Sequence, residues 1–366
     1  MAGIYIHIPF CHSKCAYCDF YSLPLKWENE FIDSLENEYR HRISELKETV
    51  NTIYLGGGTP SCLSKKSLER IFKLLPSGAQ ETTIEVNPED VTDDFINWMK
   101  NYTPVNRVSM GVQSLNNDEL KFIGRRHTAD EALSAAYSLL DYNYNLSLDL
   151  IYGLPLQSMQ SWDDSLDKII KLHPQHLSCY LLSYEPGTRL TAMKQSGKIQ
   201  EISDEMATKM YQLLCERTQN AGYKHYEISN FAISGFHSRH NSSYWDMTPY
   251  LGLGPGAHSH DGINRSYNPG NISYYLRNKG IGVNIIEEED EQERFNDFVI
   301  TSLRTSNGLN LELCEILFGL KSRLFVENIA RNLIANSIMW REKNHIGINE
   351  SYWLTSDSVM LDFIKV

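Results

Sequence analysis

The 366-residue sequence contains no long uninterrupted apolar run and no basic cluster. A membrane-spanning helix needs about 18 or more consecutive apolar residues, so none is expected. The formal net charge of −12 gives no general attraction to phosphate backbones, which makes nucleic acid a poor candidate partner. The segment Met1–His7 lacks the basic and apolar regions of a signal peptide, and a cytoplasmic location is the expectation.

Signatures of common nucleotide-binding folds are missing as well. The sequence has no Gly-x-Gly-x-x-Gly fingerprint and no phosphate loop ending in Gly-Lys-Ser/Thr, which leaves dinucleotide-binding and nucleotide-hydrolase folds without support. Cysteine is sparse, and its seven copies are an odd number, unlike the disulfide framework of a secreted protein. Three of the seven are nevertheless clustered.

Cys11, Cys15 and Cys18 place three thiols within eight residues, directly after a short apolar segment with the character of a strand. Four cysteines would close a [4Fe-4S] cluster or a structural zinc site, whereas three leave one metal position open for a substrate or cofactor. The triplet therefore predicts an iron–sulfur cluster with one open iron. The alternative is a zinc knuckle completed by His7 or His12.

From residue 3 to about residue 231, short apolar segments alternate with longer segments of helical period, which predicts repeated βα units and a parallel sheet. Strands are expected near residues 3–8, 51–55, 82–87, 106–112, 146–152 and 176–184, with a weaker candidate at 223–229. Helices are expected at residues 27–47, 64–75, 92–101, 116–123, 128–142, 158–172 and 203–221. Several of them begin at capping residues, namely Ser64, Thr92, Asn116, Thr128 and Ser203.

Polar or glycine-rich residues mark the ends of most of the expected strands. Gly56–Thr59 follows the second strand, Glu85 and Asn87 belong to the third, Gln113 follows the fourth and Asp149 lies in the fifth. In a βα barrel these strand ends meet at one face, where active sites are built. Because the cysteine triplet follows the first strand, five separate segments point to one pocket.

The acidic segment 287–294 is interpreted as a linker or as the exposed start of a helix. We therefore expect a large domain at residues 1–286 and a small one at 287–366. In the small domain, helical segments are expected to be followed by a terminal hairpin formed by residues 352–355 and 359–363.

Six motifs occur along the chain, namely Phe10–Cys18, Gly56–Pro60, Glu85–Pro88, Met110–Gln113, Gly124–Arg125 and Leu148–Pro155. Together they resemble the radical S-adenosylmethionine (SAM) enzymes and, more narrowly, the oxygen-independent coproporphyrinogen III oxidase-like family. The resemblance covers nearly the whole chain, and the motifs occur in the family's order. It implies an α/β fold, a partial (β/α)6 TIM-like barrel of the radical SAM type, followed by a small α-helical or winged-helix-like C-terminal domain.

The resemblance also assigns residues to cofactors. It implies a [4Fe-4S] cluster held by the three clustered cysteines, with SAM chelating the open iron so that an electron cleaves a C–S bond and yields a 5′-deoxyadenosyl radical. An electron donor such as a flavodoxin or ferredoxin is implied with it. The positions that match SAM contacts are Tyr5, Tyr17, Gly57, Gly58, Thr59, Glu85, Gln113, Arg125 and Asp149. Taken singly, each has an alternative role: a turn for the glycines, a barrel rim for the polar residues and core packing for the tyrosines.

Two departures separate this sequence from the oxidases of the family. Where coproporphyrinogen oxidases carry a fourth cysteine, this chain has Asp19, and only ten residues precede Cys11 in place of an N-terminal extension. Both features are similar to the heme chaperone branch of the family. The run His240-Asn-Ser-Ser-Tyr-Trp245 matches that branch's His-Asn-x-x-Tyr-Trp motif, which is associated there with heme binding.

Histidines and aromatic residues gather around this motif, in the segment of about 223–262, which is assigned to the large domain. Such a composition suits a flat apolar macrocycle and the ligation of its iron. A histidine among tyrosines and tryptophans is otherwise usually a hydrogen-bonded core or rim residue. With the resemblance, His240 is the predicted heme-binding residue and candidate axial ligand. The gathered residues are His237, His240, Tyr244, Trp245, Tyr250, His258 and His260.

The leading hypothesis is a heme chaperone that keeps a cluster and SAM site and transfers heme to acceptor proteins, among which membrane-bound respiratory proteins are candidates. The alternative is an oxidoreductase that decarboxylates the propionate side chains of coproporphyrinogen III by radical chemistry. A radical SAM enzyme with another substrate and a zinc-binding structural module complete the hypotheses. Enzymatic activity is therefore left open.

Overall fold

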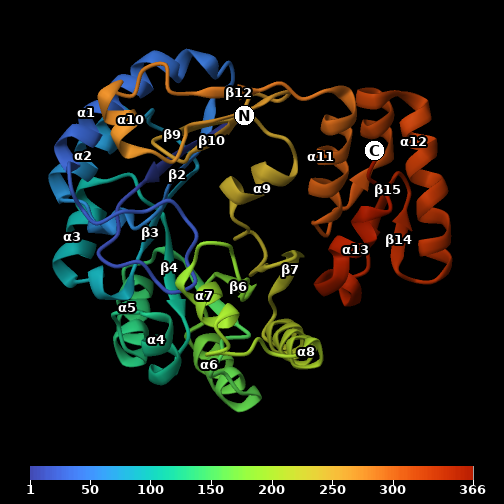
Figure 1. Cartoon of the computed structure of the whole chain (residues 1–366), viewed down its shortest axis with the longest axis horizontal. Helices are drawn as coiled ribbons and strands as arrows, with labels where there is room; N and C mark the ends of the chain where they lie inside the picture. Colours follow the sequence, from blue (N-terminus) through green and yellow to red (C-terminus); the bar gives the residue numbers. More distant parts are fainter. Residues whose placement is uncertain (366) are drawn as a thin grey trace.

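The computed structural model describes residues 1–365 and contains a twelve-stranded mixed sheet in the larger part of the chain and a three-stranded sheet in the smaller part. Six parallel strands follow one another in chain order, each separated from the next by helical segments (Figure 1). The predicted βα units are therefore confirmed. These strands are β1 (Ala2–Ile8), β2 (Val50–Gly57), β3 (Glu81–Val86), β4 (Arg107–Gln113), β5 (Asn145–Tyr152) and β6 (His176–Leu181).

Most helices of this part lie along the outside of the curved sheet (Figure 1). Each of the five predicted capping residues accepts a backbone N–H at the start of its helix, which confirms these helix starts. The helices are α1 (Glu28–Arg42), α2 (Lys65–Leu74), α3 (Asp93–Tyr102), α4 (Asn117–Ile123), α5 (Ala129–Asp141), α6 (Met159–Leu172), α7 (Arg189–Gln195) and α8 (Asp204–Asn220).

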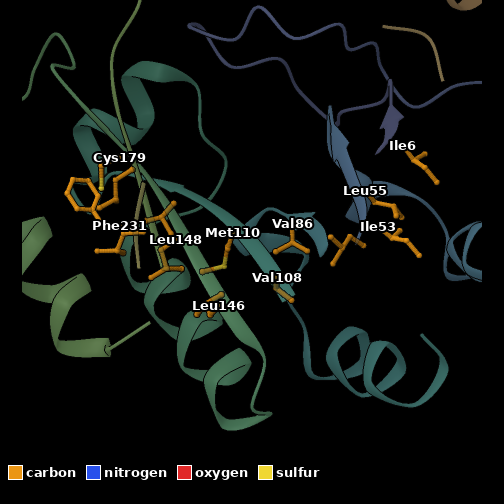
Figure 2. Close-up of a cluster of buried hydrophobic side chains, with 14 of the residues drawn as sticks. Ile6, Ile53, Leu55, Val86, Val108, Met110, Leu146, Leu148, Cys179 and Phe231 are labelled. Atoms are coloured by element: carbon orange, nitrogen blue, oxygen red, sulfur yellow. The ribbon is translucent and has the colours of Figure 1, made fainter. Parts of the chain in front are cut away.

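Alternation along the central strands gives the sheet one apolar and one polar face. Side chains such as Leu55, Val108 and Leu148 are fully buried in a cluster that also contains residues of the outer helices, and Figure 2 shows them following one another from strand to strand. Because side chains alternate between faces, the intervening residues Glu85 and Ser109 point the other way. The polar face of the sheet therefore lines the interior of the barrel.

After α8 the chain adds strands to both edges of the sheet. The resulting order is β12-β11-β10-β9-β1-β2-β3-β4-β5-β6-β8-β7, with β9 parallel to β1. The weaker strand candidate at 223–229 is confirmed as β7. These later elements are β7 (Lys224–Glu227), β8 (Asn230–Ala232), α9 (Arg239–Trp245), β9 (Tyr250–Leu253), β10 (His258–His260), β11 (Arg265–Tyr267), α10 (Ile272–Arg277) and β12 (Ile285–Glu287).

A fully buried carboxylate ties α1 to this returning segment. Glu38 accepts hydrogen bonds from the side chains of Arg42, Asn268 and Tyr275 and from the backbone N–H of Gly254. A buried charge is tolerated only when it is paired and hydrogen-bonded, and here four donors meet that requirement. Glu38 thereby fixes the position of the segment that closes the sheet beside β1.

The C-terminal lobe packs helices around the three-stranded sheet, beside the barrel (Figure 1). Asp290 caps its first helix, so the acidic segment contains a helix start, which was one of the two interpretations. No helix within residues 1–365 combines the length and apolar character needed to cross a membrane. The division into domains at residue 287 stays a prediction. The elements are α11 (Glu291–Leu303), β13 (Leu309–Asn310), α12 (Leu311–Ala335), β14 (Met339–Glu342), β15 (His345–Ile348) and α13 (Ser356–Leu361).

The predicted terminal hairpin at residues 352–355 and 359–363 is wrong. The hairpin of this lobe is β14–β15, whereas Glu350–Thr355 forms a 3₁₀ helix that leads into α13. Short apolar runs do not distinguish strand from helix by their pattern. Here Val359, Met360 and Phe363 are buried at helical spacing, so the run packs as a turn of helix.

Replacing Leu148 by alanine should lower the free energy of unfolding by about 2–5 kcal/mol, because its side chain is fully buried in the main cluster and the gap cannot close. Urea denaturation followed by tryptophan fluorescence measures the change. The matched control is Leu156→Ala, whose side chain is 55% exposed and should cost no more than about 0.5 kcal/mol. Equal losses in the two variants would contradict the assignment of the core.

Candidate functional site

A cavity of about 370 Å³ lies inside the barrel, where the carboxyl ends of β2–β6 meet the loop after β1. All of the predicted site residues except Tyr5 and His240 line this cavity, so five separate chain segments do converge on one pocket. Its predicted lining residues are Cys11, Cys15, Tyr17, Cys18, Gly57, Gly58, Thr59, Glu85, Gln113, Arg125 and Asp149.

The glycine-rich segment after β2 holds the cysteine loop in place. Gly58 and Thr59 donate backbone hydrogen bonds of 2.8 and 2.7 Å to the carbonyls of Ile8 and Phe10, immediately before Cys11. A Cβ atom on Gly58 would lie 2.4 Å from the Phe10 carbonyl oxygen, closer than atoms can approach. Only glycine therefore lets these two segments meet here.

The three thiols face one cavity but are spread apart. Cys11 Sγ lies 3.0 Å from Thr59 Oγ1, and Cys15 Sγ lies 3.5 Å from Nη1 of Arg125. Among residues 1–365, the one group of three potential metal ligands within 4.8 Å of one another is Cys215, His225 and Glu350, so the clustered cysteines do not form such a group. Their spread exceeds what a single tetrahedral zinc ion allows, with Zn–S bonds of about 2.3 Å.

Arg125 supplies a fixed positive charge at this end of the cavity. Its Nη2 donates 2.6 Å hydrogen bonds to Asn87 Oδ1 and to the Gly111 carbonyl. Burial opposes its charge, but Tyr17 and Cys15 more than compensate and raise its pKa, so the guanidinium stays charged. Gln113 lies beside it at a bulge in β4, with a left-handed φ of 68°. Bulges of this kind redirect side chains next to functional sites.

Two carboxyl groups occupy the polar face of the barrel. Burial raises the pKa of Glu85 to about 7, although hydrogen bonds from Tyr54 and the Gly57 N–H act in the opposite direction. Burial likewise raises the pKa of Asp149 to about 6, against the effect of neighbouring serines and the buried Arg107. Both groups favour a cationic ligand, because a positive charge would stabilise their ionised forms.

The two predicted tyrosines occupy different environments. Tyr17 lines the cavity between Cys15 and Cys18, whereas Tyr5 lies outside its lining and its hydroxyl meets Nδ1 of His7 at 3.1 Å. Burial raises the pKa of both phenols, so both are neutral at physiological pH. Of the pair, Tyr17 alone is placed to touch a molecule in the cavity.

His240 lies at the opposite end of the barrel, where β1 and β2 begin. Its ring is fully buried, with Nδ1 2.9 Å from Thr52 Oγ1 and Nε2 2.9 Å from the Tyr244 hydroxyl. The ring stacks on Tyr54 at 5.2 Å and fills the space left by Gly3, which has no Cβ. Burial lowers its pKa to about 3, so it is neutral. Both ring nitrogens are engaged, and heme ligation by His240 stays a prediction.

Several residues of the site were not singled out from the sequence as site residues. Asn87, which was expected at the pocket as a strand-end residue but not assigned to a cofactor, donates to Thr59 Oγ1 at 3.3 Å and accepts from Arg125. Ser109 and Ser178 also line the cavity, and neither was singled out. Strand alternation could have identified Ser109, because it lies four residues before Gln113 on β4 and so faces the same side of the sheet. No predicted site residue lies on β6, so the same rule does not identify Ser178. The fully buried Arg107 follows the same rule on β4.

Replacing Glu85 by glutamine should make the stability of the ligand-free protein less sensitive to pH. The pKa of Glu85 in the folded protein, about 7, lies above its value in the unfolded chain. The contribution of this carboxyl to the free energy of unfolding is therefore fully present below pH 4.5 and is lost as pH rises through 7. As pH rises from 4.5 to 8, the wild type should therefore lose up to about 3 kcal/mol of free energy of unfolding relative to Glu85→Gln. Urea denaturation at several pH values measures the difference, and a difference that does not change with pH would contradict the buried carboxyl.

Sequence comparisons relate this chain to known proteins. A model of the radical SAM superfamily matches residues 5–169. The heme chaperone HemW of Lactococcus lactis is 32% identical over 98% of this chain and 96% of its own length, and HemW of Bacillus subtilis is 29% identical over 100% and 99%. The mouse mitochondrial radical S-adenosyl methionine domain-containing protein 1 is 36% identical over 70% of this chain and 60% of its own length.

The fold has a solved counterpart. The coproporphyrinogen III oxidase HemN of Escherichia coli, described as a radical SAM enzyme, superposes with a TM-score of 0.83 over 99% of this chain and 89% of its own. At 23% identity this likeness concerns the fold alone, and it agrees with the barrel and C-terminal lobe described above. Full-length similarity above 30% identity is more specific, and on that ground the chain belongs to the radical SAM superfamily and, within it, to the HemW family.

Proposed function

We propose that this chain is a heme chaperone that holds a [4Fe-4S] cluster and SAM inside its barrel and transfers heme to acceptor proteins. One observation carries the proposal. The three cysteines and the polar strand ends line a single cavity, in a chain whose full-length relatives are named heme chaperones. An electron donor of the flavodoxin or ferredoxin type, acceptors that include membrane-bound respiratory proteins, and a cytoplasmic location belong to the same proposal.

The donor set fits a multi-iron cluster. Cys11, Cys15 and Cys18 present three soft sulfur ligands to one cavity, and their spread suits a cluster better than a single ion. Burial raises the pKa of Cys18 to about 11, so its proton has to leave when a metal binds. Asp19, which stands beside the triplet and lines the cavity, leaves the fourth metal position free of a protein thiolate.

The polar residues fit SAM, which carries a sulfonium, an amino group and a carboxylate. Arg125 offers its guanidinium to the carboxylate, while Glu85 and Asp149 attract the positive groups. Thr59 and Gln113 supply further hydrogen-bonding groups, and Tyr17 covers the cysteine side of the cavity. When bound, a reduced cluster supplies the electron that breaks a sulfonium C–S bond.

Replacing Cys15 by serine should abolish the cluster and its broad visible absorption after anaerobic reconstitution, because a serine hydroxyl is a poor iron ligand. Iron content per chain and the absorption spectrum measure the loss. Cys314→Ser is the matched control, since Cys314 lies on α12 in the C-terminal lobe, outside the cavity, and the variant should keep the full iron content. Four irons per chain in Cys15→Ser would reject this ligand assignment.

Hemin titration of the reconstituted protein should give saturable binding of one heme per chain, followed at the Soret band. Free hemin adheres weakly to many proteins, so saturation at a fixed stoichiometry is the decisive result. An absence of saturation would reject the chaperone function. Release of carbon dioxide from coproporphyrinogen III in the presence of SAM and a reductant would instead establish the oxidase alternative, for which the likeness to HemN offers a shared fold and no further argument.

A further inference from the structure

A second and larger cavity, of about 790 Å³, lies between the barrel and the C-terminal lobe. Its walls come from α9 and the following loop on one side and from α11 and α12 on the other. The two sides are joined beside it by a 3.0 Å backbone hydrogen bond from Ser306 to Tyr226, and further away by a 2.8 Å contact between His225 Nδ1 and Glu350. Sites for drug-sized ligands and cofactors commonly have volumes of about 300–1,000 Å³ and often lie between domains.

Helix α9 lies between the barrel and the C-terminal lobe (Figure 1), and it contacts β2 on one side and α11 on the other. His240 and Tyr244, one turn apart, are hydrogen-bonded to each other on the barrel side, and Asn241 lines the cavity that contains the cysteines. Ser242 and Trp245, three residues apart, line the interlobe cavity. At 100° per residue, His240 and Trp245 lie about 140° apart around the helix, so they face different spaces.

His237 offers a free ligand atom at the interlobe cavity. It lines the cavity, and its Nε2 is buried without a hydrogen-bond partner. The ring stacks on Tyr226 at 4.2 Å, and the Tyr226 hydroxyl is itself held at 2.8 Å by His176. Burial lowers the pKa of His237, so a neutral imidazole with an available lone pair is the resting form.

The rest of the lining suits a flat apolar iron complex. Phe298 and Phe318 contribute aromatic surface from the C-terminal lobe, and Arg294, whose Nε is buried and unpartnered, offers a charge to a carboxylate. Met247 adds a thioether from the loop after α9, where it holds a left-handed φ of 59°. Within the lining that the structure describes, His237 and Met247 alone provide an imidazole or a thioether.

We propose that the interlobe cavity is the heme site of this chain and that His237, not His240, is the axial ligand of the heme iron. The inference rests on the proposed function, which supplies heme as the ligand. It gives the helix that carries His240 a different role: α9 forms the wall that separates the heme site from the cluster and SAM site. The surface of α9 that carries Trp245 then contacts the macrocycle, while His240 positions the helix by anchoring it to β2.

Anaerobic hemin titration of the full-length reconstituted chain tests the assignment. His237→Ala should weaken binding by about tenfold or more and shift the Soret band, because an axial imidazole is lost. Added imidazole should restore the wild-type spectrum in this variant. Met247→Leu, which conserves volume, reports on the thioether through the spectrum of the reduced complex. The matched control is His41→Ala on the exposed end of α1, which should bind as the wild type does.

The outcomes separate the site from the function. Saturable wild-type binding with an unchanged spectrum and affinity in His237→Ala would overturn the site and leave the chaperone function standing. If a folded His240→Ala variant lost the Soret spectrum of the wild-type heme complex and added imidazole restored it, the axial ligand would be His240 and the assignment to His237 would be overturned. If the wild type shows only the weak, unsaturable binding that His237→Ala also shows, the proposed function fails together with the site.

Discussion

The two-residue alternation of the parallel strands is the constraint on which the rest of the molecule depends. Every second side chain is apolar and packs against the outer helices, and the side chains between them are polar and line the barrel. Parallel pairing then brings Gly111, Asp149 and Ser178 to the same level across β4, β5 and β6. A slip of one residue in β5 would exchange Asp149 for its leucine neighbours, and both the core and the cavity would be lost together.

This arrangement leaves an unusual amount of polarity inside the barrel. Glu85, Asp149 and Arg107 all lie within it, and two nitrogens of Arg107 have no hydrogen-bond partner. Buried groups of this kind lower stability unless something satisfies them. Glu85 and Asp149 line the cavity, where a positively charged ligand group would stabilise their ionised forms, whereas Arg107 lies outside the cavity lining. Local rules of folding are commonly broken at binding sites for this reason.

Much of this arrangement could be predicted from the sequence, because its signals are local. Ser64 and Thr128 cap helices through contacts within one turn, and the βα alternation follows from hydrophobic periodicity. The cysteine triplet and the strand-end residues converge because parallel barrels bring strand ends to one face. The terminal segment was mistaken for a hairpin because a short apolar run has no readable period.

The histidine motif shows where such inference ends. A sequence shows that His240 and Trp245 are five residues apart, but the space that each one faces depends on how α9 sits between two lobes. Full burial of His240 between Thr52, Tyr54 and Tyr244 is a product of contacts between distant segments. The same holds for Arg107, whose burial depends on the strands paired with β4 on either side.

The position of the larger cavity at the junction of two lobes has a thermodynamic consequence. A ligand that touches both walls binds best when the lobes are together, so its binding free energy also holds them together. Linkage makes this relation reciprocal. A macromolecule that binds better to the separated lobes lowers the affinity of the chain for the ligand, and the ligand lowers the affinity for that macromolecule by the same factor. Docking of the macromolecule and release of the ligand would then be coupled parts of a single equilibrium. Delivery of the ligand would need no separate source of energy.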